Sequence, residues 1–257
     1  MTMRLSTALR NLIANGDSVA GALENGTISI YTGAQPASAD AAIQGTLLAV
    51  ISNASGTPTA AVASTGTVTL AGSAGSVNTV TVNGTNILGP NAVPFDSTLS
   101  QTAQDVCTAI NNNLSSPRYT ASAVGAVITI AAKPNAGTAP NGFAVSATLT
   151  TLTATYANMA GGVNPANGLQ FGASSGGSVA KLAAQVWSGL NLANGTAGWF
   201  RHAGPAADPG TLDSNYQYPR IDGAVATSGG EMNLNSTAFT SGATTTIQSW
   251  GLTVPPQ

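Results

Sequence analysis

The sequence contains very few charged residues. Asp, Glu, Lys and Arg make up 6% of its 257 residues, whereas an ordinary soluble domain has about 25%. The formal net charge is −2, so no strong field is present to attract nucleic acid or an anionic membrane, and we expect neither as a partner. A surface of Thr, Ser, Asn, Gln, Ala and Gly is poorly protected against association. Such a surface suits a protein built into an assembly better than a free enzyme.

Cysteine, histidine and long apolar runs are also scarce. Cys107 is the single cysteine, which excludes an internal disulfide and a cysteine-based metal site, and we expect it to be buried on a helix. No run approaches the ~18 apolar residues that cross a bilayer. Arg10 interrupts the apolar segment that a signal peptide would need. We therefore expect synthesis in a reducing host cytoplasm, without a secretion signal.

Short alternating runs of apolar and polar residues are abundant. In residues 195–255 they are separated by Gly, Asn and Ser, and the last run extends from Thr244 to Val254. Residues 27–31 and 45–52 show further strand-like runs. This spacing is typical of an antiparallel sandwich or barrel. The sequence predicts a mainly β fold, with an antiparallel β-sandwich or jelly-roll-like body.

The N-terminus has a helical pattern instead. Apolar side chains recur with helical spacing over residues 4–14, at Leu5, Ala8, Leu9, Leu12 and Ile13. The pattern predicts a helix that ends at Asn15-Gly16, followed by a short second helix over Val19–Leu23. The apolar stripe either covers the chain's own core or docks on a neighbouring subunit. We expect the first, because most such stripes pack on their own core.

Residues 65–160 look like a separate module. Asn83-Gly84 predicts a hairpin turn, and Thr98 with Gln101 predicts the start of a helix that ends in Asn111-Asn112-Asn113. Three more strands are expected, over residues 119–123, 126–131 and 143–150. Residues 27–52 are too few to fold alone, so they belong with the C-terminal strands. The prediction is a β body of residues 1–64 and 161–257, interrupted by an inserted α+β module of residues 65–160.

Two segments follow the predicted module. Residues 178–187 alternate, which predicts one strand with Ala180, Leu182, Ala184 and Val186 on one face and Trp187 on a partly solvated face. Residues 203–219 are rich in Pro, Gly and Asp and predict a long loop. Loops of this length often make functional contacts.

Catalytic, cofactor-binding and metal-binding residues are not expected. His202 is the sole histidine and stands near Asp208 and Asp213, but no nucleophile-elbow motif accompanies it. We expect a surface or interface histidine whose charge varies with pH. The two aspartates lack the spacing of a calcium site, which needs six to eight oxygens. The nine acidic residues are scattered and single out no pair suited to glycoside hydrolysis.

Glycine-rich and aromatic segments are two further candidates for binding sites. Gly172–Gly177 has no following helix or lysine, so a phosphate cradle is not expected. Five aromatic residues could instead form a stacking platform for a carbohydrate: Trp187, Trp199, Phe200, Phe239 and Trp250. Their alternating placement favours core and subunit-interface positions.

Parts of the chain resemble a family of tailed-bacteriophage virion structural proteins. The resemblance covers residues 4–52 and 168–255, and its strongest pieces are IYTGAQPASADAA and MNLNSTAFTSGATTTI. The segments TVTVNGTNI, TAQDVCTAINNN and YTASAVGAVITIAAK are similar to a small α+β unit of phage tail proteins, including Mu-like tail sheaths. These motifs are turn-and-strand patterns, so the resemblance implies a context and no catalytic residues.

Two functions from different classes follow from these observations. The first is a non-enzymatic accessory or decoration subunit of a tailed-phage virion, on head or tail. It would form a symmetric homo-oligomer, contact other capsid or tail proteins, and use edge strands such as Thr244–Val254 for pairing between subunits. The alternative is a host- or glycan-binding tail or baseplate module that uses the insert and the 203–219 loop. An enzyme such as a cell-wall hydrolase would depend on His202.

Overall fold

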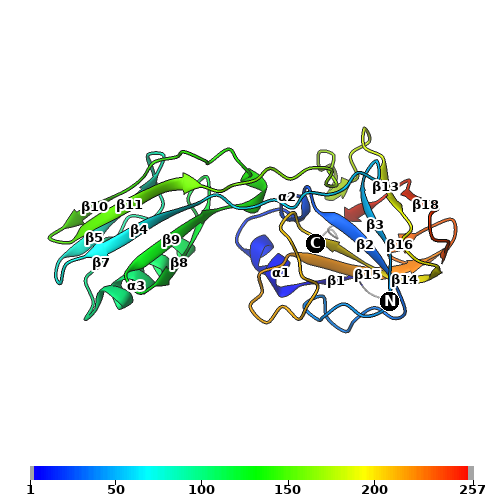
Figure 1. The fold of residues 1–257 in the computed structure, drawn as a ribbon, viewed down its shortest axis with the longest axis horizontal. Helices are drawn as coiled ribbons and strands as arrows, with labels where there is room; N and C mark the ends of the chain where they lie inside the picture. The colour runs from blue at the N-terminus through cyan, green and yellow to red at the C-terminus, as the bar shows by residue number, and fades with distance from the viewer. Residues whose placement is uncertain (1–2, 254–257) are drawn as a thin grey trace. The chain divides into compact units, whose positions relative to one another are not determined.

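The computed structural model describes residues 3–253, which form several antiparallel sheets and few helices (Figure 1). The expected mainly β class is confirmed, and a β-sandwich-like fold is compatible with the sheets. The chain divides into two compact units. Unit 1 contains the residues up to Ala60 and from Pro165 onward, and unit 2 is Ala61–Asn164. The expected insert of residues 65–160 lies within unit 2.

Unit 1 is built on a nine-stranded sheet. Seven strands follow the order β1-β15-β14-β2-β3-β13-β18, while β16 pairs with β15 and β17 pairs with β14. Their bounds are β1 Arg4–Leu5, β2 Thr27–Thr32, β3 Leu47–Asn53, β13 Trp187–Leu190, β14 Gly195–Ala203, β15 Arg220–Ala226, β16 Met232–Asn233, β17 Ala238–Phe239 and β18 Thr244–Ile247. A two-stranded sheet joins β12 (Ser178–Ala180) to β19 (Gly251–Thr253). Val254, the end of the last predicted strand, lies outside the described residues.

The N-terminal helix is shorter than the sequence predicts. Helix α1 spans Thr7–Ala14, while Arg4–Leu5 pairs with β15 as strand β1. The reason is Ser6, whose side chain accepts the backbone N–H of Leu9 at 3.2 Å and so fixes the start of the helix. Leu9 is completely buried in the unit 1 core, which confirms that the helix covers its own core. Helix α2 spans Val19–Leu23 as predicted.

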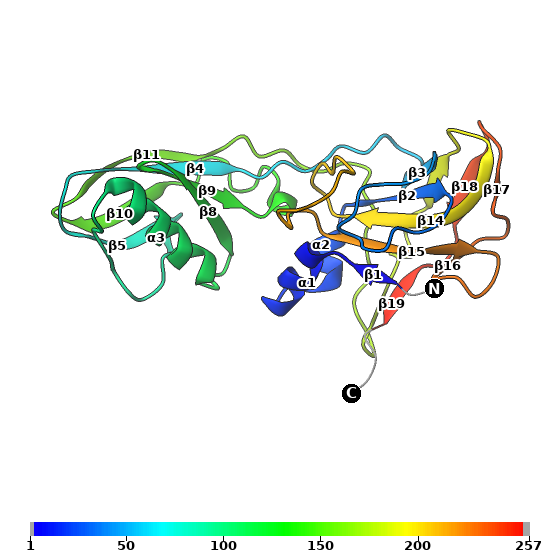
Figure 2. The ribbon, with the colours of Figure 1, turned by 90° about the horizontal axis from the view of Figure 1, so that it is seen from below.

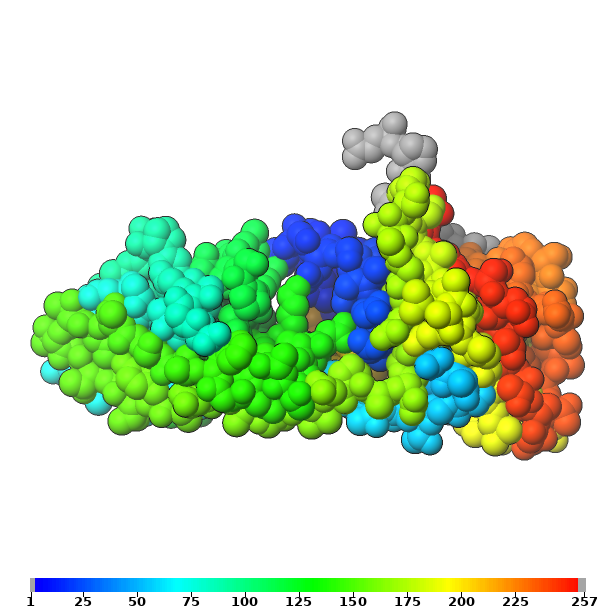
Figure 3. All heavy atoms as spheres, turned by 90° about the horizontal axis from the view of Figure 1, so that it is seen from above, coloured from blue at the N-terminus to red at the C-terminus, as the bar shows by residue number. Residues whose placement is uncertain are grey.

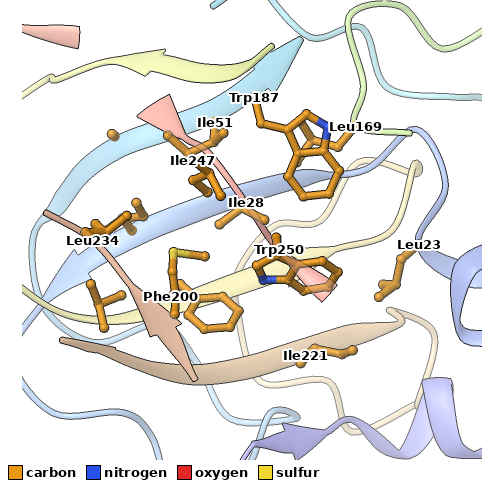
Figure 4. Close-up of a cluster of buried hydrophobic side chains, with 14 of the residues drawn as sticks. Leu23, Ile28, Ile51, Leu169, Trp187, Phe200, Ile221, Leu234, Ile247 and Trp250 are labelled. Carbon is orange, nitrogen blue, oxygen red and sulfur yellow. The ribbon is translucent and has the colours of Figure 1, made fainter. Parts of the chain in front are cut away.

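The unit 1 core gathers apolar side chains from strands that are far apart in the sequence. Figure 4 shows Ile28 and Ile51 from β2 and β3, Phe200 from β14 and the indoles of Trp187 and Trp250 within one cluster. The strands alternate between this core and the opposite face of the sheet, because side-chain direction alternates along a strand.

The single strand predicted over residues 178–187 is wrong. The chain forms β12, turns, and enters β13 at Trp187. The Gln185 side chain holds this turn, because its Oε1 accepts from the Nε1 of Trp187 at 2.9 Å. Trp187 is completely buried, whereas Val186 is 54% exposed, the reverse of the predicted facing.

Unit 2 contains two four-stranded sheets around a core of its own. One sheet has the order β10-β5-β6 with β7 also paired to β5, and the other has the order β11-β4-β9-β8. Their bounds are β4 Thr65–Ala71, β5 Ser76–Val82, β6 Thr85–Asn86, β7 Val93–Pro94, β8 Tyr119–Val124, β9 Val127–Ala132, β10 Val145–Thr150 and β11 Thr153–Ala160. Strand β11 occupies a segment for which the sequence predicts no strand.

Helix α3 spans Leu99–Asn112 and packs on β8 and β9 (Figure 2). It begins where the sequence predicts, because the Thr98 side chain accepts the backbone N–H of Gln101 at 3.1 Å. Val106, Cys107 and Ile110 turn into the unit 2 core. The predicted burial of Cys107 on a helix is confirmed.

Candidate functional site

The polar groups of unit 1 gather on the sheet face opposite the apolar core. Strand β14 shows the division: Phe200 and His202 contact the core, whereas Trp199 and Arg201 contact the other face. That face is covered by the segment between β2 and β3, whose carbonyl groups accept hydrogen bonds from it. Trp199 donates to Gln44 O at 3.1 Å, and Arg201 donates to Ala41 O at 3.1 Å.

Arg201 and Asp222 form a buried ion pair between β14 and β15. The two residues lie directly opposite each other in the sheet. The Nε and Nη2 atoms of Arg201 each donate to one carboxylate oxygen of Asp222 at 2.8 Å. Burial raises the pKa of the Asp222 carboxyl, and the ion pair with Arg201 opposes this shift. A two-pronged pair of this kind fixes orientation as well as charge.

A second ion pair anchors the 203–219 loop. Arg220 is completely buried, and its Nε donates to Asp208 Oδ2 at 2.7 Å. The Asp213 carboxylate accepts the backbone N–H groups of Gln217 and Tyr218 at 3.0 and 2.8 Å. The loop is therefore held by its own acidic residues, and these carboxylates are engaged in structural bonds.

A pocket of about 180 Å³ opens on this polar face. Ser29, Tyr31, Arg201 and Asp208 are among the residues that line it. Tyr31 stacks on Trp199 with ring centroids 4.6 Å apart, and burial raises the pKa of the Tyr31 hydroxyl. The charged groups that line the pocket belong to the two ion pairs. The pocket therefore presents a small polar surface without net charge.

Among residues 3–253, the charged side chains that line the pocket are engaged in ion pairs. General acid–base or nucleophilic catalysis needs a nucleophile within reach of a base that titrates near the working pH. Arg201 and Asp208 are committed to ion pairs, and the raised pKa of Tyr31 keeps its hydroxyl protonated. The arrangement is suited to holding two covering loops on the sheet.

His202 lies in the core, so the expected surface or interface histidine with a pH-dependent charge is wrong. Its ring is completely buried among Phe171, Trp187 and Trp250, with the Trp250 ring centroid 5.1 Å away. Within residues 3–253 neither ring nitrogen has a hydrogen-bond partner. Burial lowers the pKa of His202 to about 3, so the ring stays neutral at neutral pH. Because side-chain direction alternates along β14, His202 and its sequence neighbour Arg201 lie on opposite faces of the sheet.

The other residues considered from the sequence are not brought together into a site. Within the described part of the chain, no group of three or more His, Cys, Asp or Glu side chains is placed to hold a metal ion. Gly172–Gly177 lies between Phe171 and β12, and no helix follows it. The five aromatic residues considered for a carbohydrate platform are all buried, which agrees with core positions: Trp187, Trp199, Phe200, Phe239 and Trp250.

The two buried ion pairs are not among the features predicted from the sequence. A signal was present, because Arg201, Arg220 and Asp222 stand inside apolar strand runs of a chain that has few charges. Charged residues are rarely buried unless they are paired. Charges within such runs therefore indicate pairing across strands, although the sequence does not identify the partners.

Comparisons of this chain with protein-family models, with characterised proteins and with solved structures give no match. No helix among residues 3–253 is long and apolar enough to cross a membrane.

Proposed function

We propose that this chain is a non-enzymatic structural subunit of a tailed-phage virion, an accessory or decoration protein that self-assembles on the head or tail. The observation that carries the proposal is the uncharged surface. No charged residue occurs between Asp40 and Asp96 or between Lys133 and Lys181. Both stretches contribute many exposed residues. A surface of this kind has little protection against association, so covering it in an assembly costs little desolvation.

The hydroxyl groups of unit 2 illustrate this surface. Exposed threonine and serine side chains bond to each other across β5 and β10, with Thr79 and Thr148 oxygens 2.7 Å apart and Thr81 and Ser146 oxygens 2.7 Å apart. Neutral hydroxyl pairs therefore bridge these two strands at the surface. The resemblance of residues 4–52 and 168–255 to phage virion proteins gives the context in which such a surface is useful.

The buried charges of unit 1 support a structural role in a second way. Both arginine–aspartate pairs hold loops and strands in place, and neither is arranged around a reacting atom. An isolated buried charge is costly, so each of these buried side chains requires its oppositely charged partner. In this proposal the ion-paired residues maintain the fold of unit 1, and the uncharged surface makes the contacts of the assembly.

The test is the amount of the chain in purified virions from a host that produces it. Quantitative mass spectrometry is expected to find it at tens to hundreds of copies per particle if it decorates a lattice or tube. Three to twelve copies would place it instead at a collar, baseplate or fibre. Virions without the chain would contradict the proposal.

One observation favours the alternative, a host- or glycan-binding module. The 203–219 loop exposes two large side chains, Leu212 at 66% and Tyr216 at 52%. Tyr216 has a positive φ of 56°, a conformation that costs a non-glycine residue energy and is more frequent at functional sites. Replacement of Leu212 and Tyr216 by serine would abolish adsorption and leave particles intact under this alternative. Normal adsorption by the double variant would exclude the loop as the binding face.

A further inference from the structure

Strand β18 ends the nine-stranded sheet of unit 1 with an open edge. One side pairs with β13, where Thr244 lies opposite Leu190 and Ile247 opposite Trp187. Among residues 3–253, no backbone hydrogen bond joins the other side of β18 to another segment. Alternate residues of an antiparallel edge strand direct their N–H and C=O groups outward. These groups form a template for another strand.

Two edge strands of unit 2, β8 and β10, are protected by side chains. Asn111 of helix α3 bonds to both backbone groups of Ala121 on β8, at 2.8 and 2.9 Å. On β10 the Tyr156 hydroxyl donates to Ala147 O at 3.2 Å, and Asn158 Oδ1 accepts from Val145 N at 3.4 Å. A side chain that occupies edge groups in this way hinders the addition of a strand. Among residues 3–253, no side chain is hydrogen-bonded to the backbone of β18.

Charge does not protect β18 either. At the other end of the sheet, β1 is two residues long and carries Arg4. By contrast, residues 182–200 and 232–253, which form β13 and β16 to β19, contain no charged side chain and no proline. Short edge strands, charges and prolines are the usual means by which proteins prevent edge-to-edge pairing. Strand β18 is short, with four residues, but it carries neither a charge nor a proline.

The surface beside β18 is apolar as well as uncharged. Thr244 and Thr246 are exposed on β18, and three apolar side chains near β13 are about half exposed: Val186 (54%), Leu190 (53%) and Leu192 (54%). In Figure 3 the segment of β18 (red) lies at the surface beside that of β13 (yellow). Exposed apolar groups near an open strand edge are typical of a contact surface.

We propose that β18 pairs antiparallel with β18 of a second copy of this chain, across a two-fold axis, and joins the two sheets into one. The inference rests on the self-assembly in the proposed function and identifies its contact. The absence of charge argues for this occupant. A charged partner would lose hydration without gaining a counter-charge, whereas the same edge of a second copy brings hydroxyl, amide and apolar groups and no charge. Two-fold contacts of identical patches are the commonest in homo-oligomers.

The pairing predicts self-association that depends on protein concentration. Four residues on each side bury little area, so the contact is expected to be weak for an isolated pair and to gain strength in a multivalent assembly. Sedimentation velocity of the full chain over a range of concentrations measures the association constant. A wild-type chain that stays monomeric at every concentration would overturn both this inference and the self-assembly part of the proposed function.

The decisive variant is Thr244→Lys with Thr246→Lys. Both side chains are exposed, and the two-fold axis would bring four lysines together, so we expect self-association to weaken by about tenfold or more at low salt. The matched control is Thr120→Lys with Ser122→Lys on the protected edge strand β8, which is expected to associate like the wild type. Near-ultraviolet circular dichroism verifies that both variants are folded.

A charge-complement experiment distinguishes β18 pairing with β18 from pairing with another edge. The variant Thr244→Glu with Thr246→Glu is expected to be as weak in self-association as the lysine variant. An equal mixture of the two should associate again, because opposite charges would then face each other across the axis. If the lysine variant associates like the wild type, or if mixing restores nothing, the β18 contact is wrong. Copy number in virions would still test the proposed function separately.

Discussion

At the scale of single residues, the most unusual feature is the neutral histidine in the unit 1 core. His202 is held among aromatic rings and has no hydrogen-bond partner within residues 3–253. Its contribution to stability comes from packing, and protonation opposes that packing. Glu24 is linked to this cluster, because its carboxylate accepts the backbone N–H of Phe171.

Acid is expected to destabilise unit 1 through His202. The unfolded chain has an ordinary histidine pKa near 6.5, whereas burial lowers the folded pKa to about 3. Below pH 6.5 the unfolded state binds the proton more readily, so stability is complete above 6.5 and falls between 6.5 and about 3. The loss is about 2 kcal/mol at pH 5, from a slope of about 1.4 kcal/mol per pH unit.

Urea unfolding followed by tryptophan fluorescence measures this effect, because all three tryptophans lie in unit 1. The control is His202→Phe, which keeps an aromatic ring and removes the titrating group. The carboxylates contribute equally to both proteins, so the difference between their pH profiles isolates His202. Parallel profiles between pH 7 and 5 would contradict the assignment.

The Arg201–Asp222 pair gives a second prediction at this scale. Arg201→Met leaves the Asp222 carboxylate buried without its cation and is expected to cost about 3–5 kcal/mol of unfolding free energy. The double variant Arg201→Met with Asp222→Leu removes both charges and should recover most of the loss. Urea midpoints of the two variants give the comparison. A double variant less stable than the single one would show that the pair itself stabilises the fold.

At the scale of elements, caps decide where the helices begin. Thr98→Ala removes the side-chain acceptor for Gln101 N–H at the start of α3. The change should destabilise unit 2 by about 1 kcal/mol. Thr108→Ala is the matched control, since Thr108 is exposed in the middle of the same helix and alanine there favours the helix by a few tenths of a kcal/mol.

Cys107 provides the measurement for unit 2. It is buried, and burial raises the pKa of its thiol to about 11, so the thiolate that reacts with a disulfide reagent is scarce in the folded protein. Labelling in increasing urea therefore follows the opening of unit 2. Equal midpoints for Thr98→Ala and Thr108→Ala would argue against the cap.

At the scale of the whole molecule, each unit has a hydrophobic core of its own residues. Val80 is completely buried in unit 2. We expect Val80→Ala to lower the urea midpoint for Cys107 labelling and leave the tryptophan transition of unit 1 in place. Phe200→Ala should do the reverse, with a cost of about 3–5 kcal/mol in unit 1. A shift of both transitions by either variant would show that the units unfold together.

Local signals in the sequence determined much of the secondary structure. Strand β2 and helices α2 and α3 follow from alternation, helical spacing and the cap at Thr98. The uncharged surface is also a property of composition, and it carries the proposed function. These features depend on residues that are close in the chain, where side-chain direction and backbone preference are fixed by local geometry.

Only the tertiary structure decided which long-range partners these residues meet. The alternating pattern of residues 178–187 does not reveal that the chain turns after β12 and that Trp187 is buried, with its Nε1 bonded to Gln185. The sequence places His202 beside Arg201, but the sheet sends one side chain to an aromatic core and the other to Asp222 on the opposite face. The open edge of β18 depends on the strand order, which no local pattern specifies. Composition and periodicity define the elements, because they depend on residues close in the chain. Strand pairing and burial join residues distant in the sequence, so packing between the elements decides the core and the contact surface.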